Sequence, residues 1–156
     1  MPALLESIVS AVGIYAGTLV VGVLSGLLPV INGEIFLIGA VLLSGEVGPA
    51  IALALLVAVG QMLAKLVLYK AARGATELGK ANKIGAKIES ARARVAKWQD
   101  KPLAVTFISA VTGLPPFYLV TLLAGALGVR FSTFMVLGLV GRVVRFVALA
   151  LIVLWF

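Results

Sequence analysis

Two arginines interrupt the last apolar stretch of the chain, residues 131–156. Arg142 lies near the middle of a helix that would begin near Phe131, and Arg145 follows about one turn later on the same face. Both would lie deep in a bilayer core about 30 Å thick, where a charged side chain must face protein, water or a partner. A guanidinium is always charged and binds phosphate or carboxylate through paired hydrogen bonds. The pair therefore predicts a phosphate-binding site, and the alternative is a static ion pair with a carboxylate.

Glu34 is the carboxylate that could form such a pair. It lies in the apolar stretch 26–46, and an ionisable group at membrane depth indicates a functional site. We expect Glu34 to pair with Arg142 and Arg145 in the empty state, or to carry a coupling ion. Two arginines against this carboxylate leave spare positive charge, which favours the phosphate site.

The apolar stretch 49–69 carries two further polar side chains, Gln61 and Lys65. Gln61 is expected to hydrogen-bond across helices and to contribute to the substrate site. Lys65 lies one turn later and has two interpretations. Its amine either faces the site and pairs with charge there, or extends along the helix to the cytoplasmic interface.

The composition restricts the class of protein. The 156 residues are 62% hydrophobic and 12% charged, with a net charge of +7 and a mean hydropathy of +1.19. A soluble domain has about twice that charged fraction, so a single integral membrane domain is predicted. The sequence has no cysteine and no histidine, so we expect no metal site and no cofactor. No nucleophile–base pair is recognisable either, and an enzyme is not predicted.

The expected fold is all-α, with three spanning helices and two re-entrant helical hairpins in inverted repeats. Helix breakers define the hairpins, because proline and glycine disfavour an uninterrupted helix. The breakers are Pro29, Asn32 and Gly33 in the first hairpin, and Gly113, Pro115 and Pro116 in the second. The predicted order is a spanning helix 3–25, a hairpin 26–46, a spanning helix 49–69, a hairpin 102–128 and a spanning helix 131–156.

Nine of the thirteen basic residues lie between residues 70 and 101. Apolar residues there recur every three or four positions, which predicts an amphipathic helix over 74–98. This helix lies in the membrane interface, docks on the protein's own core, or does both. The positive-inside rule makes loop 70–101 cytoplasmic. Basic residues beside apolar segments also indicate contact with an anionic membrane surface rather than with nucleic acid.

The two hairpins and the helices after them form a weak internal repeat. Leu42-Leu43-Ser44-Gly45 matches Leu122-Leu123-Ala124-Gly125, and Gly60-Gln61 matches Gly141-Arg142. If loop 70–101 is cytoplasmic, the first hairpin enters from outside and the second from the cytoplasm. Inverted repeats with broken membrane helices are typical of transporters with a midplane site. The alternative is a pair of unrelated hairpins.

Two blocks of short motifs run along the chain. The first is Pro29-Val-Ile-Asn-Gly-Glu34, followed by Ala40, Gly45, Gly60, Tyr69 and Arg73-Gly74. The second is Phe107-Ile-Ser-Ala with Gly113-Leu-Pro-Pro-Phe, followed by Ala124-Gly125-Ala126, Phe131 or Phe134, and Gly141-Arg142. Together they cover about residues 25–147 and resemble the DedA family, also called the VTT or SNARE-associated Golgi protein family.

The resemblance implies two re-entrant hairpins in inverted repeats. It also implies movement of phospholipids or polyprenyl phosphates across the membrane, in some members with proton coupling. Glu34 corresponds to the family's hairpin glutamate. Lys65 stands where the family often has an aspartate, and Ala110 where it often has an arginine. These departures put proton coupling in doubt, and the basic role is expected to have moved to Arg142 and Arg145.

The expected function is therefore transport of an anionic lipid between the leaflets of the cell inner (plasma) membrane by a multi-pass protein. Its partners would be membrane lipids and their phosphate groups, and a homodimer suits so short a chain. Two other classes stay open. One is a small-solute or ion exporter of the same fold, and the other is a membrane adaptor that uses helix 74–98 to recruit partners.

Overall fold

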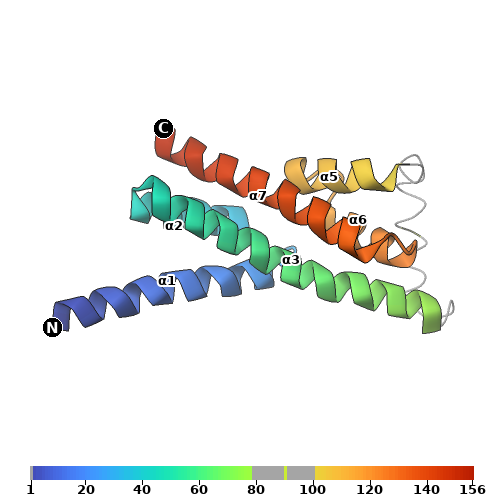
Figure 1. The fold of residues 1–156 in the computed structure, drawn as a ribbon, viewed down its shortest axis with the longest axis horizontal. Helices are drawn as coiled ribbons and strands as arrows, with labels where there is room; N and C mark the ends of the chain where they lie inside the picture. The colour runs from blue at the N-terminus through green and yellow to red at the C-terminus, as the bar shows by residue number, and fades with distance from the viewer. Residues whose placement is uncertain (1, 79–89, 91–100) are drawn as a thin grey trace. The chain divides into compact units, whose positions relative to one another are not determined.

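A computed structural model describes residues 2–78, 90 and 101–156 of the chain. These residues form six α-helices and contain no β-strand, so the all-helical class is confirmed for this part of the chain (Figure 1). The helices are α1 (Pro2–Leu27), α2 (Gly33–Ser44), α3 (Val47–Leu78), α5 (Pro102–Thr112), α6 (Phe117–Ala126) and α7 (Phe131–Trp155). Most of the amphipathic helix predicted over 74–98 lies outside the described residues.

Two of the helices could cross a membrane by length and composition. These are α3, over Val47–Ala75, and α7, over Phe131–Trp155. Along α7 the apolar side chains of Val140, Val144 and Ile152 are exposed, as expected of a helix that faces lipid. The predicted spanning helix 3–25 corresponds to α1, and the part of α1 whose side chains are described contains the apolar helix Gly13–Leu27. A third span stays a prediction.

Both breaks in the helices lie where the breaker residues predict them. The first separates α1 from α2, and the Asn32 side chain caps α2 by accepting hydrogen bonds from the amides of Glu34 and Ile35, at 2.9 and 3.3 Å. The second separates α5 from α6. There Gly113 has a positive φ of 82°, which a side chain would disfavour, and the Leu114–Pro115 peptide bond is cis.

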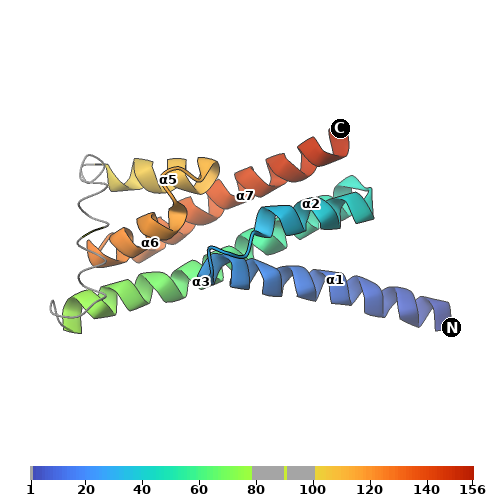
Figure 2. The ribbon, with the colours of Figure 1, turned by 180° about the vertical axis from the view of Figure 1, so that it is seen from behind.

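The arms of the first hairpin differ from the prediction. Segment 26–46 contains one complete helix, α2, and the arm that runs against it is α1 (Figure 2). The reason is that the break lies at the start of this segment and not in its middle. The second hairpin, α5 with α6, does lie within 102–128. Each half of the chain therefore has the same order: helix, break, short helix, long helix. Re-entry of either hairpin into a membrane stays a prediction.

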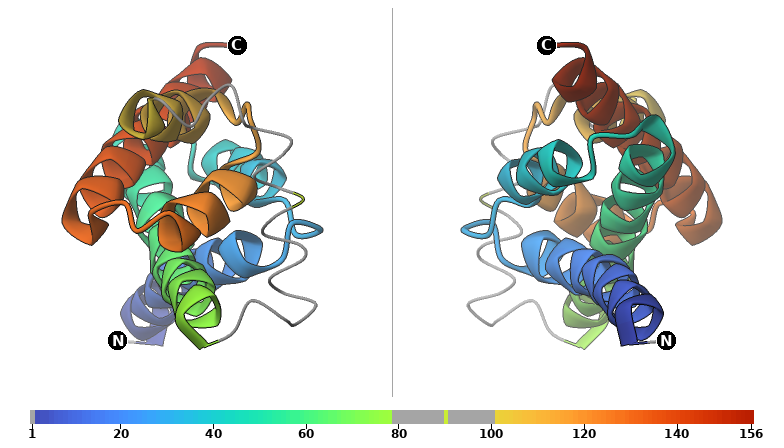
Figure 3. Two further views of the ribbon diagram at one scale, coloured as in Figure 1. Left: turned by 90° about the vertical axis from the view of Figure 1, so that its right-hand side faces the viewer. Right: turned by 90° about the vertical axis from the view of Figure 1, so that its left-hand side faces the viewer.

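The chain divides into two compact units. The first consists of Met1–Gln61 with Phe146–Phe156, and the second of Met62–Arg145. Helices α1, α2 and the start of α3 belong to the first unit (Figure 3, right). Helices α5, α6, the end of α3 and the start of α7 belong to the second.

A glycine on each long helix packs against the first arm of the preceding hairpin. In the first unit, a Cβ on Gly60 of α3 would lie 2.6 Å from the carbonyl oxygen of Leu19 on α1. In the second unit, a Cβ on Gly141 of α7 would lie 2.5 Å from the Cβ of Ala110 on α5. Both distances are too short for a side chain, so glycine is required at both positions. In the predicted match of Gly60-Gln61 with Gly141-Arg142, the two glycines therefore have similar packing against the first arm of their hairpin.

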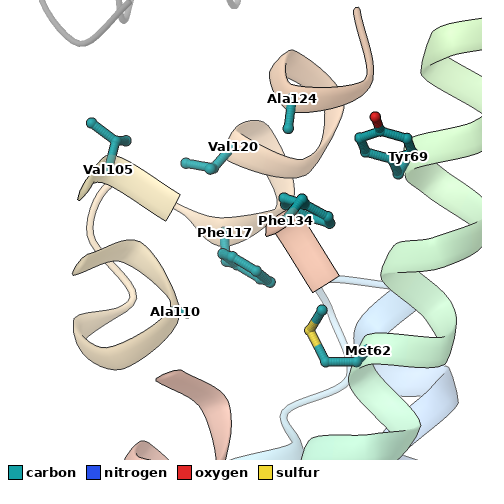
Figure 4. Packing of buried hydrophobic residues seen from close by; sticks show 8 residues of the cluster. All are labelled: Met62, Tyr69, Val105, Ala110, Phe117, Val120, Ala124 and Phe134. Carbon is teal, nitrogen blue, oxygen red and sulfur yellow. The ribbon is translucent and has the colours of Figure 1, made fainter. Parts of the chain in front are cut away.

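Stacked aromatic rings form the core of the second unit (Figure 4). The ring of Phe134 on α7 lies 5.3 Å from that of Tyr69 on α3 and 5.9 Å from that of Phe117 on α6, measured between centroids. The Tyr69 hydroxyl donates to the carbonyl oxygen of Val129. These contacts fix the first residue of α6 between the two long helices of this unit.

Candidate anion site at the start of α6

Arg142 is held over the first residue of α6. Its side chain is 9% exposed, and its guanidinium carbon lies 4.6 Å from the centroid of the Phe117 ring. Phe117 itself stacks on Phe134, so the ring beneath the cation is fixed by the core. An arginine over an aromatic face is attracted by the ring quadrupole. The N–H groups at the edge of its planar guanidinium can still donate hydrogen bonds to another group.

Lys65 is held over the second residue of α6. Its Nζ lies 5.2 Å from the centroid of the Tyr118 ring, and the residue is only 4% exposed. Lys65 is therefore buried inside the second unit, and its role at a site stays a prediction. Lys65 and Arg142 thus lie over the rings of two adjacent residues of α6. Two buried cations therefore gather at one end of α6.

That end of α6 has no side-chain cap. Pro116 occupies the N-cap position and has no side chain that could accept a hydrogen bond. The ten residues of α6 direct their partial positive charge toward this end, and uncapped amides at a helix N-terminus bind anions. Two buried cations and an uncapped helix start make an arrangement suited to a phosphate or a carboxylate.

Arg145 is directed at the break between α5 and α6. Its Nη1 donates a hydrogen bond of 3.0 Å to the carbonyl oxygen of Val111, near the end of α5. The guanidinium also lies against Gly113, where a Cβ would be 3.3 Å from Nη1. The two predicted arginines thus have different surroundings within the same unit. Arg142 lies at the start of α6, and Arg145 lies at the end of α5.

Glu34 and Gln61 belong to the first unit, beside the other break. Glu34 is half-buried near the start of α2, and Gln61 on α3 is buried. The Gln61 Nε2 donates to Ser25 Oγ at 3.0 Å, and Ser25 Oγ donates to the carbonyl oxygen of Gly22 at 2.9 Å. The Gln61 Oε1 is buried and accepts no hydrogen bond from the described residues. The predicted pairing of Glu34 with Arg142 or Arg145 stays a prediction.

The predicted breaker residues have separate local roles. Gly33 is buried, and a Cβ there would lie 2.8 Å from Ser25 Oγ. Pro29 is exposed in the first break. In the second break, the Pro115 carbonyl oxygen accepts a hydrogen bond of 2.5 Å from Ser109 Oγ. The two breaks are therefore ordered by specific contacts to the helix before them.

Sequence reasoning missed the two aromatic residues beneath the cations. Phe117 and Tyr118 directly follow Pro115 and Pro116, and that adjacency to a helix start was the available signal. Within the described part of the chain, no group of three or more acidic, histidine or cysteine side chains could hold a metal ion.

Comparison of the chain with models of protein families, with curated proteins and with solved structures finds no match.

Proposed function

We propose that this protein moves an anionic lipid between the two leaflets of a membrane and binds the lipid phosphate at the start of α6. The observation that carries the proposal is the burial of Arg142 and Lys65 over the first two residues of an uncapped helix. A polyprenyl phosphate or a phospholipid has the required negative charge and the required apolar tail.

The distribution of charge along the sequence supports an anionic ligand. No acidic residue follows Asp100, and Glu34 is the only one between residues 7 and 45. Burying charged groups in an apolar environment is costly, and a phosphate bound beside Arg142 and Lys65 would lower that cost. In this proposal Glu34 pairs with the cations in the empty state or carries a coupling ion.

The repeated element order supports transport over simple binding. Each half contains a helix, a break, a short helix and a long helix, and loop 70–101 between the halves is basic. A cytoplasmic loop at that position gives the halves opposite orientations, and alternating access by rocking of one half follows. The resemblance of the motifs to the DedA family points the same way. We place the protein in the inner membrane as a multi-pass protein.

A flip assay in liposomes tests the proposal. Purified protein is reconstituted with a fluorescent lipid phosphate, and the fraction quenched by external dithionite is followed over time. Arg142→Gln should lower the rate about tenfold, because hydrogen bonds to a charged group contribute about 1.5–3 kcal/mol. Arg130→Gln is the matched control, since Arg130 is exposed, and should stay within about twofold of the parent.

The assay has two outcomes that contradict the proposal. If Arg142→Gln flips the lipid as fast as the parent, the phosphate is not bound at α6. If the parent flips no lipid but passes a small anion into sealed vesicles, the protein is an exporter of the same fold. The proposed lipid substrate is then wrong.

A further inference from the structure

Arg145 connects the long helix α7 to the break before α6. Its hydrogen bond to the Val111 carbonyl oxygen, at 3.0 Å, satisfies one of the carbonyls left without an intrahelical partner at the end of α5. The contact of its guanidinium with Gly113 uses the space left by the missing side chain. Arg145 therefore contacts the chain at the residues where it turns from α5 toward α6.

The rest of the second break is also ordered. The Gly113 amide donates to the Ser109 carbonyl oxygen at 2.8 Å, and Thr112 Oγ1 accepts from the Leu114 amide at 3.1 Å. Ser109 Oγ donates to the Pro115 carbonyl oxygen. These bonds join the break to α5 alone. The hydrogen bond from Arg145 to Val111 connects the break to α7 as well.

The first unit contains a similar connection. Gln61 of the long helix α3 donates to Ser25, two residues before the end of α1, and lies against Gly33 at the start of α2. Gln61 and Arg145 each follow the packing glycine of their helix, by one and by four residues. In both units a polar side chain of the long helix is fixed on the end of the hairpin's first arm. Such a repeated contact indicates a role in holding the hairpin.

We propose that Arg145 is a positioning residue, which fixes the α5–α6 break and thereby sets the start of α6 beneath Arg142 and Lys65. This rests on the proposed function, in that the start of α6 is the phosphate site. It assigns Arg145 a role different from the direct contact with phosphate that the sequence predicts. In this proposal the guanidinium acts through Val111 and Gly113 on the backbone of Phe117 and Tyr118.

Two substitutions on opposite sides of one contact test this role. Arg145→Met removes the donor and the charge, whereas Gly113→Ala keeps the arginine and inserts a methyl group 3.3 Å from its Nη1 at a positive φ. The probe is dodecyl phosphate, titrated by calorimetry against the full-length protein in detergent. Each substitution should lower the affinity about tenfold, and the double variant should be no weaker than either single variant.

Two further measurements separate positioning from direct contact. The salt dependence of dodecyl phosphate affinity should be unchanged in Arg145→Met, because the charges at the phosphate are the same. Arg145→Lys, which keeps a donor and a charge, should recover part of the affinity. Hydrogen exchange at the amides of Leu119 and Val120, which donate to the Pro116 carbonyl oxygen, should be faster in both single variants and unchanged in Arg142→Gln. Circular dichroism checks that each variant retains its helical content.

A flattened salt dependence in Arg145→Met, with parent affinity in Gly113→Ala, would make Arg145 a direct ligand and overturn the proposal. Parent affinity in both variants would also overturn it. If the parent binds no dodecyl phosphate, the proposed function fails, and hydrogen exchange still tests the positioning role. Parent exchange rates at the amides of Leu119 and Val120 in both variants would then refute it.

Discussion

Arg142 and Lys65 differ in what they can offer an anion, although both are buried at the start of α6. The guanidinium of Arg142 presents a rigid fork of donors, which fits two oxygens of a phosphate at once. The ammonium of Lys65 is a compact charge on a flexible stem. In the proposed site the arginine therefore sets the orientation of the phosphate, and the lysine contributes mainly charge.

We predict that Lys65→Met lowers the affinity for dodecyl phosphate about tenfold, since one of two buried charges is lost. The methionine keeps most of the apolar stem, so packing against Tyr118 is retained. The affinity should also depend less on salt than in the parent. Lys70→Met is the matched control, because Lys70 lies over the Phe131 ring on the same helix but is exposed. Equal affinities in the two variants would place the phosphate away from Lys65.

At the scale of elements, packing of the long helices depends on glycine in two different ways. The Cβ of Gly60→Ala would contact backbone atoms of α1, and no substitution on α1 can remove those atoms. The Cβ of Gly141→Ala would contact the Cβ of Ala110, and the substitution Ala110→Gly removes that Cβ. We therefore predict that both substitutions destabilise the protein by about 1–3 kcal/mol, and that Ala110→Gly rescues only Gly141→Ala.

Unfolding of each variant in detergent, followed by circular dichroism, measures these effects. Gly48→Ala is the control, because no atom lies within 4 Å of a Cβ at Gly48. The double variant Ala110→Gly with Gly141→Ala should unfold close to the parent. A double variant as unstable as Gly141→Ala alone would show that α5 and α7 do not pack through these two residues.

The cap of α2 gives a third prediction. Asn32→Ala should weaken the start of this helix by about 1 kcal/mol, since its side chain accepts hydrogen bonds from the amides of Glu34 and Ile35. Asn32→Asp keeps an acceptor and should behave like the parent. Hydrogen exchange at the amides of Glu34 and Ile35 measures the effect. Exchange that is equally slow in Asn32→Ala would mean that α2 does not need the cap.

Breaker residues predicted where the helices stop, but they could not predict which helices become the arms of a hairpin. Pro29 and Gly33 mark the first break, and the chain is apolar on both sides of it. Whether α1 spans alone or pairs with α2 depends on packing, such as that of Ser25 on α1 against Gly33 on α2. The second hairpin was simpler, because its break lies in the middle of a short apolar stretch.

The candidate site shows the same limit for single residues. The depth of Arg142 in an apolar helix predicted its burial, since a guanidinium there has no short path to water. For Arg145 the same argument could not distinguish a residue that binds phosphate from a residue that fixes the break between α5 and α6. That distinction depends on the Val111 carbonyl, which is 34 residues away along the chain. Contacts of this kind leave no periodic signal in a sequence.

At the scale of the whole molecule, the number of membrane crossings decides whether the two halves are inverted. If α3 crosses the membrane once, residue 46 at its start and residue 101 before α5 lie on opposite sides. Both Glu46 and Lys101 are exposed, and the sequence contains no cysteine, so a single introduced cysteine can report its own location. The positive-inside rule predicts that Lys101 lies in the cytoplasm.

We predict that Glu46→Cys reacts with a membrane-impermeant maleimide in intact cells, and that Lys101→Cys reacts only after the inner membrane is permeabilised. Arg130→Cys, before α7, should behave like Lys101→Cys, because α5 and α6 form a hairpin whose two ends lie on one side. Reaction of all three from the same side would show that α3 does not cross. Reaction of Lys101→Cys and Arg130→Cys from opposite sides would show that the second hairpin crosses the membrane. In either case the inverted repeat, and with it alternating access between two opposed hairpins, would be excluded.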